Sequence, residues 1–181
     1  MNLPTKEEAQ KLLESHVQDE YQRYHVKMVA TAMEGYATVF GEDSLLWYLT
    51  GFLHDIDFEE FPDKHPAESL QWFKEWGYPD ELIHAVEAHA YGYNGFTTLP
   101  GGKLAGALMA CDELSGIFYA YKKINPVPYD QMKVSSILKR LKEKAFAAKI
   151  EREAIYRGCD VLGVPLEKHV EHLISFFSSL D

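Results

Sequence analysis

Glycine and proline divide the chain into segments whose apolar residues recur at helical spacing. Val170, Leu173 and Phe177, for example, follow Pro165 at intervals of three and four residues, which places them on one face of a helix. No segment shows the alternating Val, Ile or Thr residues that predict a half-buried strand. We therefore predict an all-α fold, a compact helical bundle without internal repeats or low-complexity tracts.

Capping residues and breakers set the expected ends of these helices. Thr5 and Glu8 have the spacing of a capping box, and Gly41 follows the apolar face of the second helix. The expected helices cover about residues 5–18, 21–40, 44–55, 66–76, 79–89, 104–124 and 134–152, followed by a segment to 163 and a terminal helix from 165. Residues 91–102, rich in glycine and aromatics, are expected to form a loop at the rim of a site.

One domain accounts for the 181 residues and their 46% hydrophobic content. We expect residues 1–181 to form it, with a metal-ligand core over about 21–122 and a C-terminal helical segment over about 126–181.

The formal charge of −10 argues against binding to a nucleic acid polymer or a membrane surface. Eight basic residues against three acids between Lys133 and Arg157 are the local exception. Whether the chain forms a homo-oligomer is left open.

The sequence also predicts a compartment. The N-terminus lacks the features of a secretory signal, and no apolar run approaches the roughly 20 residues that cross a bilayer. We expect a soluble, cytoplasmic protein in which Cys111 and Cys159 are buried thiols.

Four potential metal ligands fall on the apolar sides of expected helices: His25, His54, Asp55 and Asp112. Neighbouring helical side chains point about 100° apart, so a His-Asp pair can serve one ion only where its helix ends or where the ion sits between the two directions. Burying several imidazoles and carboxylates is costly unless a cation or mutual hydrogen bonds compensate. Such a mixed set suits divalent Fe, Mn, Zn, Co or Ni. The remaining histidines, His16, His84, His169 and His172, are expected at the surface or between helices.

This arrangement resembles the HD-domain superfamily of metal-dependent phosphohydrolases, whose pattern is a histidine, a His-Asp pair and a distant aspartate. It looks most like the small HDIG-type branch, in which a histidine often followed by proline and a histidine ending the next helix supply a second metal. His65 with Pro66, and His89, match that description. The resemblance runs from about Tyr24 to Asp112, and the segments KRLKEKAFAAKIERE and GCDVLGVPLEKHV extend it to most of the chain.

The chain departs from the family pattern directly after the His-Asp pair. Asp57 replaces the glycine, and Phe58 replaces a common lysine that would face the substrate. Asp57 either accepts a hydrogen bond from a ligand imidazole or is a solvated loop carboxylate; both interpretations stay open. The missing cation must come from elsewhere. The candidate substrate contacts are Arg23, Tyr24, Lys64, Tyr91, Lys139 and Lys142.

The resemblance implies hydrolysis of a phosphate ester or anhydride in a nucleotide or another small phosphorylated metabolite. One or two divalent ions (Fe, Mn, Co, Ni, Zn or Mg) would activate a water, with His54 and Asp55 as the catalytic pair and Asp55 bridging two ions. His25, His54 and Asp112 would complete one ion, and His65 and His89 the other. Two alternatives remain: a di-iron oxygenase similar to inositol oxygenase, and a noncatalytic metal-binding sensor or interaction domain.

Overall fold

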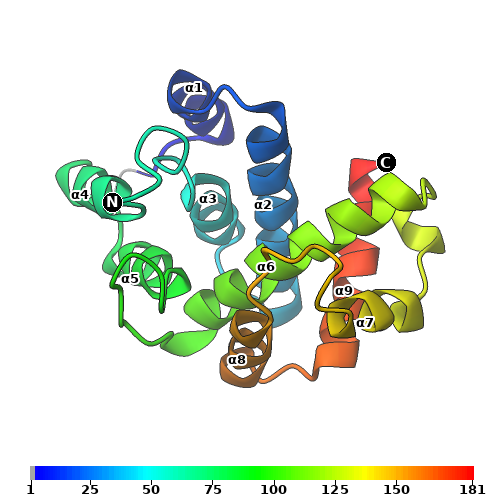
Figure 1. Ribbon diagram of the computed structural model, residues 1–181. Helices are drawn as coiled ribbons and strands as arrows, with labels where there is room; N and C mark the ends of the chain where they lie inside the picture. Colours follow the sequence, from blue (N-terminus) through cyan, green and yellow to red (C-terminus); the bar gives the residue numbers. More distant parts are fainter. Residues whose placement is uncertain (1–2) are drawn as a thin grey trace.

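The structure, a computed structural model, describes residues 3–181. Within this range the chain forms nine α-helices and two short 3-10 helices, without a strand (Figure 1). The all-α prediction is confirmed. The helices are α1 (Lys6–His16), α2 (Glu20–Phe40), α3 (Ser44–Leu53), α4 (Ala67–Glu75), α5 (Asp80–His89), α6 (Gly102–Ile124), α7 (Val134–Lys142), α8 (Arg152–Leu162) and α9 (Leu166–Phe177), with η1 (Tyr129–Gln131) and η2 (Ser178–Leu180).

The helix ends follow the capping residues of the sequence. The Thr5 side chain accepts a hydrogen bond from the Glu8 backbone N–H, and the Glu8 carboxylate accepts one from the Thr5 N–H, which completes the expected capping box. Asp43 caps α3 by accepting from two backbone N–H groups. Gly41 ends α2 in the left-handed region, at φ 70°, where glycine carries no steric penalty.

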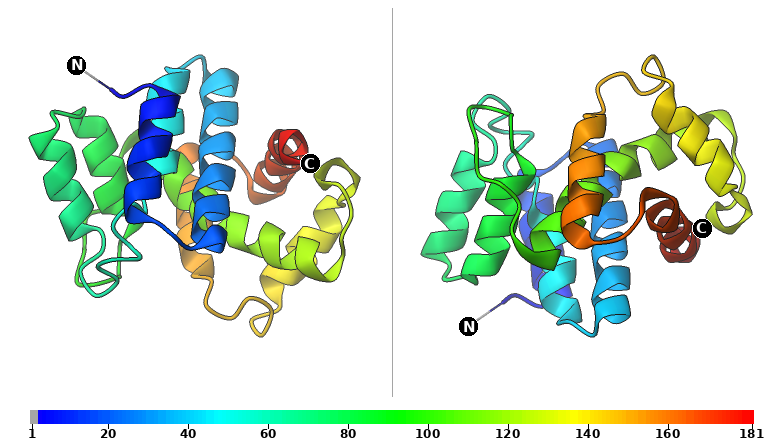
Figure 2. Two further views of the ribbon diagram at one scale, coloured as in Figure 1. Left: turned by 90° about the horizontal axis from the view of Figure 1, so that it is seen from above. Right: turned by 90° about the horizontal axis from the view of Figure 1, so that it is seen from below.

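The two longest helices, α2 and α6, cross near the middle of the molecule (Figure 1). α3 packs along α2, and α5 and α8 pack against α6. In both views of Figure 2, α4 and α5 lie at one end of the molecule and α7 at the other. No helix within residues 3–181 combines the length and apolarity needed to cross a membrane.

α6 and α8 approach each other closely because glycine lies at their crossing. A Cβ atom added to Gly158 would lie 2.4 Å from the backbone nitrogen of Ala110 and 2.8 Å from the carbonyl oxygen of Gly106. Cys111 and Cys159, the residues that follow this contact on each helix, are buried free thiols, as expected.

The single basic helix expected over residues 134–152 is wrong. α7 ends at Lys142 and α8 begins at Arg152, and residues 143–151 form an irregular segment in which Ala147 has a φ of 46° (Figure 2). The Arg152 side chain donates to five backbone carbonyl oxygens of residues 141–150. These bonds satisfy carbonyl groups that a continuous helix would have satisfied internally.

Candidate metal centre

The helices bring together the six residues that the sequence predicts as metal ligands. These residues are His25 in α2, His54 and Asp55 after α3, His65 before α4, His89 at the end of α5, and Asp112 in α6. Among the described residues, three groups have donor atoms that all lie within 4.8 Å of one another: His25, His54 and Asp55; His54, His89 and Asp112; Asp55, His65 and His89. The groups share members and form one unit, called here the His/Asp cluster.

Asp112 joins two histidines on one side of the cluster. Its Oδ1 atom lies 2.9 Å from Nε2 of His25 and 3.4 Å from Nε2 of His54. Nε2 of His54 is also 3.4 Å from Oδ1 of Asp55. The adjacent residues His54 and Asp55 can both face the centre because α3 ends at Leu53, as the geometry of a regular helix requires.

Asp55 connects this side of the cluster to the other two histidines. Its Oδ1 atom lies 3.2 Å from Nε2 of His65 and 3.6 Å from Nε2 of His89. The two Nε2 atoms of His65 and His89 are 3.1 Å apart. Asp55 therefore has the central position expected of a bridging carboxylate, although the bridging role stays a prediction.

Three of the histidines are oriented by a hydrogen bond at Nδ1, the ring nitrogen that faces away from the cluster. Nδ1 of His54 donates to the carbonyl oxygen of Gly51 at 2.8 Å, and Nδ1 of His89 donates to that of Val86. Nδ1 of His65 lies 2.6 Å from a carboxylate oxygen of Asp57. A proton fixed on Nδ1 leaves the Nε2 lone pair free, and this tautomer is the one that binds a metal through Nε2. The tethers thus orient three Nε2 atoms toward the same carboxylates.

The environment of His54 provides a direct test of whether a cation fits. Its Nε2 atom is buried and makes no hydrogen bond within the described part of the chain, although oxygens of Asp55 and Asp112 lie 3.4 Å from it. A buried polar nitrogen without a partner is costly. A divalent cation would satisfy this nitrogen, and the imidazole and carboxylate donors around it suit such an ion. The cluster is therefore able to hold a metal ion.

The charges of the cluster also favour a bound cation. Burial alone would lower the pKa of His54, but the carboxylates of Asp55 and Asp112 outweigh it and raise the pKa to about 9. Burial would raise the pKa of Asp112, yet the nearby imidazoles of His54 and His25 hold it well below its usual range. Buried carboxylates that stay ionised require a compensating positive charge. Protonated imidazoles supply this charge when no metal ion is bound.

Two supporting residues stand behind the cluster. Gln22 donates its side-chain amide to Oδ2 of Asp55 at 2.7 Å; the sequence interpretation missed it, although its position three residues before His25 places it on the same helical face. Asp57 is fully buried and accepts from both His65 and the backbone N–H of Ser69. The interpretation of Asp57 as a solvated carboxylate is therefore wrong.

Three of the expected substrate contacts have other partners. Arg23 donates to the carbonyl oxygen of Val17 at 2.7 Å and to the side chain of Gln18. The Tyr24 hydroxyl lies 3.0 Å from that of Tyr129. Lys64 is exposed and pairs with Glu68 at 3.2 Å. None of these partners is a residue of the cluster.

Tyr91 lies in the expected rim loop, and the Arg157 guanidinium stacks on its ring at 4.4 Å. The same loop reaches the cluster through Asn94, whose amide donates to the carbonyl oxygen of His65 at 2.9 Å. Lys139 and Lys142 are exposed on α7, which packs on α9 and α6 at the far end from α5. Their role in substrate binding stays a prediction.

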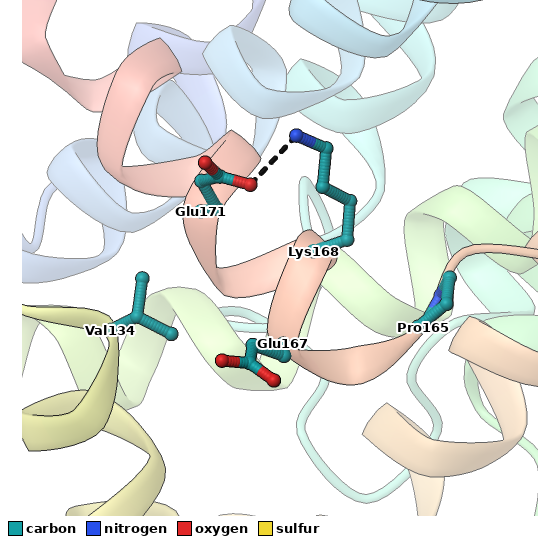
Figure 3. A pocket seen from close by; sticks show the side chains of 5 residues that line it. All are labelled: Val134, Pro165, Glu167, Lys168 and Glu171. Atoms are coloured by element: carbon teal, nitrogen blue, oxygen red, sulfur yellow. Dashed lines mark hydrogen bonds and ion pairs between the residues drawn. The ribbon is translucent and has the colours of Figure 1, made fainter.

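Two hollows formed by residues in the described range 3–181 are lined by residues outside the cluster. One of about 400 Å³ lies between the start of α7 and α9 and is lined by Val134, Pro165, Glu167, Lys168 and Glu171 (Figure 3). Its lysine already pairs with Glu171 at 2.7 Å. Another of about 340 Å³ lies among α1, α2 and α3 beside Arg23 and Tyr24. Because neither has converging groups like those of the cluster, we place the functional site at the cluster.

Comparison with known proteins gives one match. The sequence model of the HD domain matches residues 23–126, a range that contains all six residues of the His/Asp cluster. Neither a curated protein nor a solved structure gave a significant match. Most proteins with an HD domain are metal-dependent phosphohydrolases.

Proposed function

The chain belongs to the HD domain family, and from this premise we propose that it is a metal-dependent phosphohydrolase. The proposed substrate is a phosphate ester or anhydride of a nucleotide or of another small phosphorylated metabolite. The observation that carries the proposal is the buried, unpartnered Nε2 of His54, which lies 3.4 Å from an oxygen of Asp55 and from one of Asp112. Two carboxylates thus each present an oxygen to this nitrogen.

The cluster offers enough donors for two ions. His25, His54 and Asp112 would hold one, and His65 and His89 the other, with Asp55 between them. A divalent metal bound there supplies Lewis acidity toward a phosphoryl oxygen and a water of lowered pKa.

Hydrogen bonds from other groups of the protein would hold the metal ligands in fixed orientations. The Gly51 and Val86 carbonyls and the Asp57 carboxylate hold three imidazoles in the Nδ1-protonated form. The Gln22 amide fixes one Asp55 oxygen and leaves the other toward the histidines. Such preorganisation reduces the rearrangement needed when substrate binds.

The proposal is tested by measuring metal content and turnover on the same samples. Protein purified without chelator is analysed for metals and then assayed against nucleotides and simple phosphate esters with Mn, Co, Ni, Zn, Mg or Fe. We expect bound metal and metal-dependent release of phosphate, and we expect His54→Ala to lose both. His84→Ala is the matched control, because His84 lies outside the cluster and accepts from the backbone N–H of Gly101.

The same samples separate the alternatives. Oxygen consumption that requires iron, without phosphate release, would support the oxygenase. Bound metal without turnover of any compound would support a noncatalytic domain. Full phosphatase activity in a folded His54→Ala protein without metal would refute the assignment.

A further inference from the structure

The proposed function leaves the source of a substrate-facing cation unexplained. The ring of Phe58, which replaces the lysine common in the resembled branch, packs on His65 with a ring distance of 5.3 Å. Arg23 and Lys64 are occupied by other partners. In a chain of net charge −10, a phosphate would be repelled unless the bound metal and a local cation attract it.

Residues 143–151, called here the return segment, run from α7 back to α8 (Figure 2). The Arg152 guanidinium determines its path, because it donates to the carbonyl oxygens of Leu141, Glu143, Phe146, Ala147 and Ile150. The planar fork of a guanidinium can serve several acceptors at once, which a lysine ammonium does less well. The return segment therefore has a defined conformation without being helical.

The end of the return segment packs on α6. A Cβ atom added to Gly116 would lie 2.4 Å from Cδ1 of Ile150, so Ile150 packs directly on the glycine. Gly116 is four residues after Asp112, and residues at this spacing share one face of a helix. The backbone N–H of Glu151 also donates to the Glu113 carboxylate at 3.1 Å. Ile150 thus contacts α6 one helical turn after Asp112, a predicted metal ligand.

The return segment carries two lysines, Lys144 and Lys149. Both are exposed, and neither is in an ion pair with any residue in the range 3–181. Lys149 directly precedes Ile150, so its backbone is fixed next to α6 while its long side chain stays free to move. An ammonium that is free of ion pairs is available to bind a phosphate oxygen.

We propose that the return segment is the phosphate-binding wall of the metal site, with Lys149 as the contacting cation and Arg152 as a positioning residue. This inference rests on the proposed function, since it assumes that the ligand carries a phosphate. The irregular return segment takes the place of the middle of the expected basic helix and fixes the backbone of Lys149 next to α6.

The test is the affinity of the metal-loaded protein for inorganic phosphate, measured by calorimetry. We expect Lys149→Ala to weaken binding about tenfold, as the loss of one charge-assisted contact predicts. Lys133→Ala is the matched control, because Lys133 is an exposed lysine at the start of α7 and should leave the affinity unchanged. Arg152→Lys should also weaken phosphate binding while metal content stays that of the wild type.

The outcomes distinguish the two proposals. Equal phosphate affinity in Lys149→Ala and Lys133→Ala would overturn the inference, and so would failure of the metal-loaded wild type to bind phosphate. If phosphate binding depends on Lys149 but no ester is hydrolysed, the proposed role of the return segment in phosphate binding is supported. The assignment as a phosphohydrolase then fails. Because Lys149 is exposed, its variant tests the inference even if Arg152→Lys does not fold.

Discussion

The Asp57 carboxylate lies 2.6 Å from Nδ1 of His65 and is fully buried. Its second oxygen accepts from the Ser69 N–H at 2.9 Å, within the first turn of α4. One side chain thus orients an imidazole of the cluster and caps the helix that follows it. The aspartate at the family's glycine position is therefore part of the structure of the site.

Asp57→Asn should weaken metal binding at His65 and His89 without removing a ligand. An amide cannot hold the proton on Nδ1 as a carboxylate does, and loss of such a partner typically lowers metal affinity about 10- to 100-fold. The measurement is metal content per chain and a titration against a chelator of known affinity. Asp63→Asn, in an exposed position of the same connection, is the control. Equal affinities in the two variants would contradict the prediction.

Metal removal should lower the thermal stability of the protein. A ligand that binds only the folded state stabilises it by about 2.7 kcal/mol at a free concentration 100 times its Kd, or roughly 5–10 °C in Tm for a chain of this size. We expect a chelator to lower the Tm of the wild type by this order and to leave His54→Ala unaffected. A wild-type Tm that is the same with chelator and with added metal would count against a metal in the cluster.

Much of the fold follows from local sequence signals. Glycine, proline and capping residues set the helix ends, and the apolar faces correctly place His25 and Asp112 toward the interior. The His/Asp cluster could be anticipated because each of its members lies on such a face or at a helix end. These predictions depend only on residues close together in the sequence, and the helices of the structure agree with them.

The features that could not be predicted depend on contacts between distant residues. The sequence KEKAFAAKI contains no glycine or proline, and its alanines and lysines favour a helix. In the structure α7 instead ends at Lys142, and the Arg152 side chain donates to five carbonyls between Leu141 and Ile150. The pairing of Gln22 with Asp55 likewise depends on how α2 packs on the end of α3. Propensity and periodicity carry no information on such contacts.

The protein should lose stability in mild acid because of His169. Burial lowers the pKa of His169 to about 4, although its hydrogen bond to the Ala110 carbonyl opposes the shift. The folded state therefore resists protonation that the unfolded state accepts at its ordinary pKa of about 6.5. This contribution, about 3 kcal/mol, is complete above pH 6.5 and is lost as the pH falls toward 4.

The measurement is the free energy of unfolding between pH 4 and pH 7.5 for the wild type and His169→Gln. We expect the difference between the two proteins to shrink as the pH falls, because the variant lacks the titrating group. His16→Gln, at a partly exposed position, controls for a general effect of losing an imidazole. A difference that is constant with pH would contradict the assignment to His169.

Gly158→Ala should destabilise the protein although alanine favours helices. In an exposed helix the change would be worth about 1 kcal/mol in favour of alanine. Here the added Cβ would lie 2.4 Å from the Ala110 nitrogen, and backbone cannot yield as a flexible side chain does. The two helices must move apart, which typically costs about 1–3 kcal/mol and occasionally more.

The movement of α6 away from α8 in Gly158→Ala should also displace Asp112, because Asp112 follows Ala110 by two residues on α6. We expect a lower urea midpoint and a weaker metal affinity in Gly158→Ala than in Asp160→Ala, an exposed position of α8 where substitution should change stability by less than about 0.5 kcal/mol. If Gly158→Ala were as stable as the control, the close approach of α6 and α8 would not be needed for the fold. If it lost stability but kept its metal affinity, the position of Asp112 would be independent of the α6 and α8 contact.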